Sequence, residues 1–171
     1  DPDFAYLMGL FIADGWWSRP TQLPISGKDG KPKEKQKEWV KSYCIKKNYN
    51  FYWHWKYIGI NSKECVQEMK QYVNQDKTLK TINFDEGTLL RLLEGLKADA
   101  CVRANELTYG TIKPKLAIQI RAMYRMLGYQ CSLKRVDNHG GFGKNPIYRI
   151  GVKIKKKNLS KRKVISKDSI G

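Results

Sequence analysis

Two aspartates at the ends of apolar segments are the strongest candidates for chemistry in this sequence. An apolar run over residues 4–12 ends in Asp14 and Gly15, and a second apolar segment, residues 89–100, carries Asp99 near its end. Glycine tolerates the left-handed backbone that often ends a helix, so Gly15 predicts that Asp14 lies at a helix C-terminus. The helix dipole disfavours a carboxylate there. We therefore expect a positive group, either a basic side chain or a metal ion, to hold Asp14.

A close contact between two helices is expected to position these carboxylates. Gly9 lies within the first apolar run, and a glycine in a helix interior costs roughly 1 kcal/mol. The approach of a second helix would explain a glycine at this position. The second segment has a small residue of its own, Gly95, and we expect both glycines at the helix contact.

Two alignments of the second segment with the first remain open. Matching Gly95 to the packing glycine puts Ala100 in the place of the terminal aspartate, whereas matching Asp99 to that aspartate puts Glu94 in the place of the glycine. We prefer the second alignment, with a slip of one residue within the helix, because it sets Asp99 against Asp14.

The elements that follow the two aspartates repeat along the chain. After each aspartate come a predicted short hairpin, a Lys-Pro-Lys sequence, a one-sided helical pattern and two strands. Ser62 is expected to cap one further helix that closes the first half. These later helices and strands are predicted at residues 39–47, 51–61, 62–73, 116–127, 131–136 and 147–154.

This order predicts an α+β fold of two pseudo-twofold αββαββ(α) repeats that form a saddle of antiparallel sheets. Each repeat has one sheet face to bury, and the two would dock through their apolar helices. Docking of that kind brings Asp14 and Asp99 together at the pseudo-twofold axis.

The charge of the chain indicates its partner. The 171 residues carry a formal net charge of +17, from 33 lysines and arginines against 16 aspartates and glutamates. A balance so far from neutral predicts a polyanionic partner, with nucleic acid ahead of a membrane surface. No stretch reaches the ~18 consecutive apolar residues that predict a membrane span.

The cysteines and histidines argue against a disulfide framework or a zinc site. Neither His54 nor His139 has a partner at ligand spacing, and no Cys-x-x-Cys pair occurs. We interpret the cysteines as reduced core thiols of an intracellular protein, in the cytoplasm, the nucleoid or an organelle. A signal peptide and an initiator methionine are absent, so we expect a piece of a longer chain. The scattered cysteines are Cys44, Cys65, Cys101 and Cys131.

The segment Leu7–Gly15 resembles the signature helix of the LAGLIDADG (dodecapeptide) homing endonucleases, and residues 89–100 resemble a degenerate second copy. The resemblance is to the monomeric two-repeat type and covers the chain from Phe4 to about Lys157. It implies a first repeat over residues 1–78, a second over 79–157, and a basic tail over 158–171.

The activity that the resemblance implies is site-specific cleavage of both strands of double-stranded DNA, at a long asymmetric target, by Mg²⁺-dependent phosphodiester hydrolysis. An alternative stays open because the second motif is irregular. A protein of the same fold could bind DNA, nick one strand, or fold RNA as a maturase, with little or no double-strand cleavage.

The chemistry needs an activated water and charge stabilisation on the leaving oxygen, and divalent metals between two carboxylates supply both. Oxygen ligands favour Mg²⁺, with Ca²⁺ or Mn²⁺ as substitutes. We therefore expect Asp14 and Asp99 to be catalytic and to bind metal, with Ala13 and Ala98 as adjoining metal-site positions.

The family also uses basic residues near each metal site. The sequence Lys80–Phe84 resembles the Lys-x-Ile-Pro segment that precedes the second signature helix in intein endonucleases, with Asn83 in place of the proline. Lys80 is the first candidate for that role. Lys153 is the expected counterpart in the second half, with Lys144 as an alternative.

The sheet faces are expected to carry basic and aromatic residues toward DNA, because a β-ribbon fits the major groove. In the aromatic strand after Asn50 we expect the side of His54 and Lys56 to face the DNA. Plain solvated strand faces remain the alternative for any single residue. The candidate DNA-binding residues are Arg19, Gln22, Lys28, His54, Lys56, Arg103, Tyr109, Lys134, Arg135, Lys144, Arg149 and Lys153.

An origin in an intein is also indicated. The segment Leu116–Tyr129 resembles the intein block between the second signature and the sheet, and the tail Val164–Gly171 resembles the return into a splicing domain. The chain begins with Asp1 and ends with Gly171, so it lacks the nucleophile and the His-Asn pair that splicing needs. We expect the endonuclease domain of an intein, or a close free-standing relative.

Overall fold

The computed structural model describes residues 1–137 and 145–154. The chain forms two compact units, Asp1–Asp99 and Ala100–Gly171. This division concerns compactness, whereas the predicted boundary at residue 78 concerns a duplication and stays a prediction. Within the described ranges, no helix is both long enough and apolar enough to cross a membrane.

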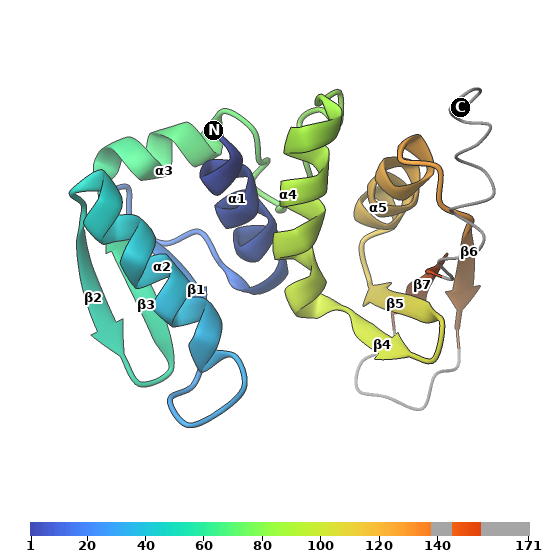
Figure 1. The fold of residues 1–171 in the computed structure, drawn as a ribbon, viewed down its shortest axis with the longest axis horizontal. Coiled ribbons are helices and arrows are strands. Elements are labelled where there is room, and N and C mark those ends of the chain that lie inside the picture. Colours follow the sequence, from blue (N-terminus) through green and yellow to red (C-terminus); the bar gives the residue numbers. More distant parts are fainter. Residues whose placement is uncertain (138–144, 155–171) are drawn as a thin grey trace. The chain divides into compact units, whose positions relative to one another are not determined.

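Two helices dominate the first unit. Helix α1 spans Pro2–Asp14 and begins at Asp1, whose side chain caps it, and helix α4 spans Glu86–Leu96. A 3₁₀ turn, η1, continues α4 over Lys97–Asp99. The two helices lie side by side (Figure 1).

The contact between α1 and α4 depends on two glycines, as expected. A Cβ atom on Gly9 would overlap the carbonyl oxygen of Leu92 and lie 2.6 Å from the amide nitrogen of Leu96. A Cβ atom on Gly95 would overlap the carbonyl oxygen of Tyr6. Each glycine therefore meets the backbone of the opposite helix, and neither helix can accept a larger residue there without moving away.

A three-stranded antiparallel sheet completes the first unit. Its strand order is β1-β3-β2, with β1 at Leu23–Ser26, β2 at Asn50–His54 and β3 at Tyr57–Asn61. Helices α2, Glu34–Lys47, and α3, Lys63–Lys70, flank it, and the Ser62 side chain caps α3 as predicted. The side chains of Leu23, Ile25, Ile58 and Ile60 are fully buried on one face.

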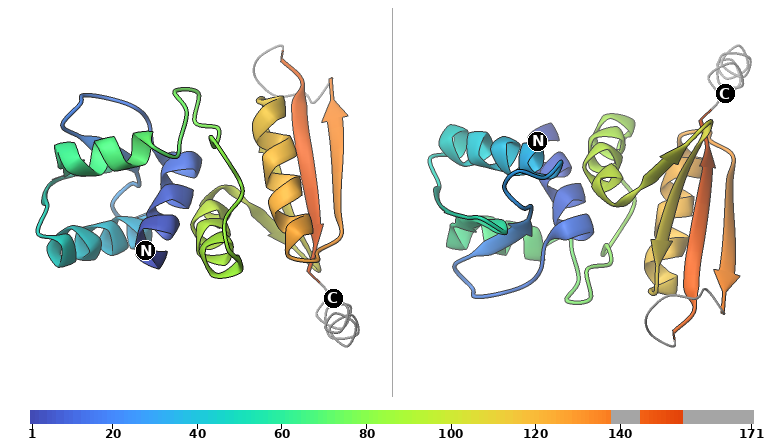
Figure 2. Two further views of the ribbon diagram at one scale, coloured as in Figure 1. Left: turned by 90° about the horizontal axis from the view of Figure 1, so that it is seen from above. Right: turned by 90° about the horizontal axis from the view of Figure 1, so that it is seen from below.

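The second unit is a four-stranded antiparallel sheet with one helix. The strand order is β4-β5-β7-β6, and α5 spans Pro114–Met126. Figure 2 shows α5 along one face of this sheet, where Leu107, Ile150 and Val152 are buried. The strands are β4 at Cys101–Arg103, β5 at Glu106–Thr111, β6 at Cys131–Val136 and β7 at Ile147–Lys153.

The predicted α+β class with antiparallel sheets is confirmed, but two local predictions are wrong. No regular hairpin follows α1. Between α1 and β1 there is only an isolated bridge, in which Gly15 pairs with Ile25 of β1. Gly15 also adopts extended backbone, with φ −94° and ψ 174°, rather than the left-handed form. A glycine is needed there because a Cβ atom would overlap the ring of Phe11.

The cysteine prediction holds only in part. All four cysteines are free, and Cys44 and Cys65 are buried thiols whose pKa values burial raises to about 12. Cys101 is exposed and Cys131 is partly exposed, so neither is a core thiol.

The helix contact predicts a sharp difference between two glycine substitutions. Gly9→Ala should lower the free energy of unfolding by about 2 kcal/mol or more, because the methyl group forces two helix backbones apart. Gly87 lies in the first turn of α4, where the nearest atom to an added Cβ, Oδ1 of Asp85, is 3.5 Å away. Gly87→Ala should therefore stabilise the protein by about 0.5–1 kcal/mol. Urea denaturation of both variants tests this, and equal effects would contradict the packing.

Candidate functional site

Two side chains hold Asp14 at the end of α1. Gln36 lies in α2, and Lys33 directly precedes α2. Lys33 Nζ donates to both carboxylate oxygens of Asp14 at 2.8 Å, and Gln36 Nε2 donates to Asp14 Oδ2 at 2.9 Å. Only 11% of the Asp14 side chain is exposed. The positive group that the helix dipole requires is thus a lysine.

Lys77 supports the same helix end from another direction. Its Nζ donates to the carbonyl oxygens of Phe11, at 3.3 Å, and Gly15. Carbonyl groups in the last turn of a helix lack partners within the helix, and a cation there is favourable. Lys77 itself has a φ of 66°, in the left-handed region. Two lysines therefore lie around the C-terminus of α1.

Asp99, at the end of η1, interacts electrostatically with Asp14. Its pKa is raised, first because surrounding protein atoms remove part of its hydration and second because the charge of Asp14 repels it. The charges of Lys33 and Lys77 oppose this shift. Asp99 is nevertheless exposed, so its carboxylate can reach a ligand from solvent. The two carboxylates predicted to meet belong to one electrostatic cluster within the first unit.

The 3₁₀ turn explains how both Gly95 and Asp99 reach their places. From Gly9 to Asp14 there are five steps along α1, but from Gly95 to Asp99 there are four. A 3₁₀ turn rises about 2.0 Å per residue against about 1.5 Å in an α-helix, so η1 makes up much of the missing step. Gly95 packs against α1, and Glu94 is exposed beside Lys97. The assignment of Asp99 rather than Ala100 to the second catalytic position stays a prediction.

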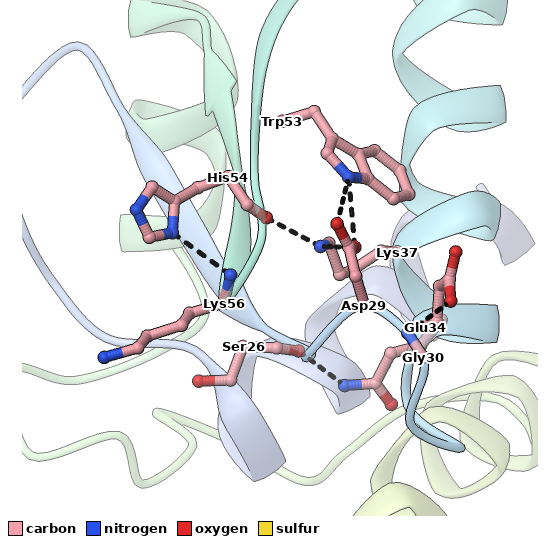
Figure 3. A network of polar contacts seen from close by, with 9 residues as sticks. Ser26, Asp29, Gly30, Glu34, Lys37, Trp53, His54 and Lys56 are labelled. Carbon is pink, nitrogen blue, oxygen red and sulfur yellow. Dashed lines mark hydrogen bonds and ion pairs between the residues drawn. The ribbon is translucent and has the colours of Figure 1, made fainter.

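A network around the fully buried Lys37 positions the loop before α2 (Figure 3). Lys37 Nζ donates to Asp29 Oδ1 and to the carbonyl oxygen of His54, both at 2.7 Å, and lies 4.2 Å from the centroid of the Trp53 ring. The Trp53 indole also donates to Asp29, at 3.1 Å.

These contacts tie the loop and the start of α2 to β2. The hydrogen bond from Lys37 lowers the pKa of Asp29, so the interaction is present at neutral pH and is lost as pH falls below the ordinary value of 3.8. Gln36 Nε2 adds a bond to the carbonyl oxygen of Ser26 at 2.9 Å. The network therefore fixes the segment that carries Lys33 and Gln36 to Asp14.

Asp14 and Asp99 are the candidate ligands for a divalent cation. Among the described residues, no group of three or more histidine, cysteine, aspartate or glutamate side chains could hold a metal. Asp14 and Asp99 supply oxygen donors of the kind that Mg²⁺ and Ca²⁺ prefer. A cation there would remove the repulsion that raises the pKa of Asp99. Ala13 and Ala98 adjoin the pair and are both partly buried.

The roles expected of Lys80 and Lys153 stay predictions. Lys80 is exposed, and the lysines whose charges act on Asp99 are Lys33 and Lys77. Lys153 lies in the second unit, at the end of β7, and its role stays a prediction. The sequence analysis did not identify Lys33, Gln36 or Lys77 as residues at the end of α1. The Lys-Pro-Lys signal before α2 could have found Lys33, since a proline there marks the helix start.

The DNA-binding candidates of the first unit have different surroundings. Arg19, Lys28 and Lys56 are exposed, and His54 is partly exposed. Lys56 lies in the turn between β2 and β3 rather than on a strand. Gln22 is only 7% exposed and donates to Asn61 Oδ1 at 2.9 Å, so its amide is already used within the sheet.

In the second unit, the pairing of strands separates the candidates by face. Lys134 pairs with Arg149, so both side chains lie on one face of the sheet. Glu106 pairs with Arg103 on one side and with Lys153 on the other, and these two basic side chains lie on the same face. Alternation puts this face opposite the one that α5 covers. The candidates Arg103, Lys134, Arg149 and Lys153 are all exposed.

One candidate in this unit is buried, one lies on the other face of the sheet and stays a prediction, and one cannot be placed. Tyr109 is 2% exposed, and its hydroxyl lies 2.6 Å from that of Tyr124 on α5. Arg135 alternates with Lys134, so it lies on the other face, and its Nε donates to Asp137 at 2.8 Å. Lys144 lies outside the described residues, as do His139 and the predicted tail.

The chain has the LAGLIDADG fold, as its similarity to solved structures shows. Its structure is similar to one from a study of mesophilic variants of the homing endonuclease I-DmoI, with a TM-score of 0.64, 15% identity, and coverage of 96% of this chain and 91% of that chain. It is also similar to I-DmoI in complex with DNA and Mn, with a TM-score of 0.63, 15% identity, and coverage of 99% and 97%.

Other comparisons add a second member of the fold and a partial relative. The N-terminal LAGLIDADG domain of DUF199/WhiA has a TM-score of 0.56 at 12% identity, over 99% of this chain and 87% of that one. The ATP-dependent DNA helicase Hel308 of Thermococcus kodakarensis is 37% identical over 71 residues. That match covers 39% of this chain and only 6% of the helicase. No protein-family model matches the chain.

The raised pKa of Asp99 predicts how stability responds to charge and metal. The folded protein holds this proton more tightly than the unfolded chain, so stability falls as pH rises from 3.8 through the folded pKa. At pH 7 without divalent cations, Asp99→Asn should therefore melt at a higher temperature than the wild type. Adding Mg²⁺ should raise the melting temperature of the wild type and leave that of the variant unchanged.

Glu94→Gln is the matched control for this experiment, because it removes the same charge from an exposed position on the same helix. Its melting temperature should change little in either condition. A lower melting temperature for Asp99→Asn without metal would contradict the repulsion between the two carboxylates.

Proposed function

We propose that this chain is a site-specific DNA endonuclease that hydrolyses phosphodiester bonds in both strands, acting as a monomer. The observation that carries the proposal is the electrostatic cluster of Asp14, at the end of α1, and Asp99, at the end of η1. Lys33 and Lys77 belong to the same cluster. The net charge of +17 suits a polyanionic substrate. The similarity to I-DmoI in complex with DNA supports the same direction.

The two carboxylates would hold a divalent cation, with Mg²⁺ as the expected ion. The cation supplies activation of water and charge stabilisation at the phosphate when it is bound. Solved structures of I-DmoI contain Mn, Mg or Ca with DNA. The metal and the DNA are thus properties of the neighbours, which we extend to this chain on the strength of its own carboxylate pair.

The side chains around the pair have separate tasks in this proposal. Lys33 and Lys77 would place positive charge near the phosphate, where negative charge develops in the transition state. Gln36 holds Asp14 in one orientation, because its amide bonds both Asp14 and the carbonyl oxygen of Ser26. The buried Lys37 network fixes the segment on which these groups lie.

Sequence recognition would come from the sheet faces. In the second unit, the exposed face with Arg103, Lys134, Arg149 and Lys153 offers long cationic side chains that can bond to guanine edges in the major groove. In the first unit, Lys28 and Lys56 are exposed near the β2–β3 turn and suit phosphate contacts.

An intein is the proposed context of the domain. The support is the likeness of Lys80–Phe84 and Leu116–Tyr129 to intein endonuclease segments, and the second of these forms most of α5. A free-standing endonuclease remains the alternative context.

A DNA-binding protein that nicks or does not cut is the second candidate function. The specific observation is that Lys33 Nζ bonds both oxygens of Asp14, so a metal must displace or share this lysine. The LAGLIDADG fold of a WhiA domain shows that the fold also occurs outside proteins described as homing endonucleases. Linear or nicked product decides between the two functions.

Cleavage of a plasmid library with a randomised insert tests the proposal and identifies the target in the same experiment. With Mg²⁺, the wild type should linearise a subset of plasmids that share one long sequence. Asp14→Asn and Asp99→Asn should each lower the rate by roughly 100-fold or more, whereas Glu94→Gln should cut as the wild type does. Nicked circles alone would favour the second function, and binding with no metal-dependent cut would reject the endonuclease.

A pair of lysine variants tests which basic residue serves the site. Lys77→Met should slow cleavage by roughly 100-fold, because it removes a cation beside the carboxylate pair. Lys80→Met removes the same charge at an exposed position three residues further along the chain. This variant should cut at the wild-type rate. Single-turnover rates on the selected target measure both, and the reverse ranking would restore Lys80 to the role that the sequence predicted.

A further inference from the structure

Five aromatic rings form a continuous array in the first unit. The aromatic array consists of Trp16, Tyr52, His54, Trp55 and Tyr57, and each ring lies near another. Tyr57 is central, with ring centroids 5.4 Å from Trp16, 6.1 Å from Tyr52 and 4.7 Å from His54. His54 and Trp55 continue it at 6.1 Å with nearly parallel planes.

The array is on the side of the sheet away from the buried isoleucines. Tyr57 pairs with His54 and Gly59 pairs with Tyr52, so the two β2 rings share a face with Tyr57, while Ile58 and Ile60 point to the other face. The exposed fractions are 39% for Trp16, 50% for Tyr52 and 54% for Trp55. Large rings exposed together cost hydration free energy and commonly mark a binding surface.

Cations border the array. Lys56 Nζ lies 4.8 Å and Lys28 Nζ 6.0 Å from the centroid of the Trp55 ring, and both lysines are exposed. Neighbouring rings with cations beside them suit a chain of alternating bases and phosphates. Proteins that bind single strands combine these same two elements, with bases stacked on aromatic rings and a positive groove along the backbone.

The accessible part of a base decides which form of nucleic acid fits. In an intact duplex the flat faces of the bases are stacked on one another, and only their edges are open in the grooves. Exposed rings gain little from edges but can stack on bases that have left the duplex. The rings therefore favour unpaired nucleotides over an intact double helix.

We propose that the aromatic array binds single-stranded DNA by stacking on unpaired bases, with Lys28 and Lys56 on its phosphates. The choice of DNA over RNA rests on the proposed function, whereas the preference for unpaired bases rests on the rings. The array would hold a locally opened or cut strand of the substrate next to the sheet.

Two variants of one residue test the stacking. Anisotropy of a labelled oligothymidylate, measured in EDTA, gives the affinity without any cleavage. Tyr52→Ala should weaken binding about 5- to 150-fold, the equivalent of one lost stacking contact. Tyr52→Phe keeps the ring and should bind as the wild type does. Thermal melting checks that both variants fold, and Trp55→Ala provides a second truncation on the exposed part of the array.

The controls separate this inference from the proposed function. Asp14→Asn should bind the oligothymidylate as the wild type does, so a failed endonuclease would leave this result intact. Affinity for a duplex should not change with Tyr52→Ala. Unchanged oligothymidylate binding by Tyr52→Ala and Trp55→Ala, or an equal loss for duplex, would overturn the stacking. Tighter binding of oligouridylate than of oligothymidylate would overturn the choice of DNA.

Discussion

The close approach of α1 and α4 is the contact on which the rest of the site depends. Gly9 faces the backbone of α4, and Gly95 faces the backbone of α1, so no side chain separates the helices. Helix α1 ends in Asp14, and the η1 turn that continues α4 ends in Asp99, so the two carboxylates interact electrostatically. The packing of two small residues thus sets the separation of Asp14 from Asp99, far from any residue that would itself do chemistry.

Bringing two carboxylates together at helix ends is unfavourable, and surrounding lysines offset part of that cost. Lys33 neutralises Asp14 directly, and Lys77 bonds the carbonyl groups of the last turn of α1. The pKa of Asp99 stays raised, first because burial removes part of its hydration and second because the charge of Asp14 repels it. The Lys37 network stabilises this arrangement, because it ties the loop before α2 to β2. Binding of a cation by the two carboxylates would remove the repulsion between them.

Much of this arrangement could be predicted from the sequence, because short-range patterns encode it. The apolar run before Asp14, the glycine within it, and the order of helices and strands all follow from local propensity and periodicity. The pairing of Asp14 with Asp99 followed from the repeat. The one-residue mismatch in the second motif could be recognised, but its solution, a 3₁₀ turn over Lys97–Asp99, depends on packing that only the structure provides.

What the sequence could not provide are contacts set by tertiary position. Lys77 and Lys80 are equally plausible as sequence positions, and only the path of the segment before α4 places Lys77 at the end of α1. Tyr109 and Arg135 look like binding residues, yet the side on which α5 packs buries one and turns the other away from Lys134. The choice of face depends on where α5 packs.

The central claim is that Asp14 and Asp99 act on each other across the α1–α4 contact. Carboxyl-carbon NMR titration of Asp99, in the wild type and in Asp14→Asn without divalent cations, measures this most directly. We expect a pKa of Asp99 above 3.8 in the wild type that falls part of the way back in Asp14→Asn, because desolvation remains and the repulsion is removed. The same pKa in both proteins would contradict it.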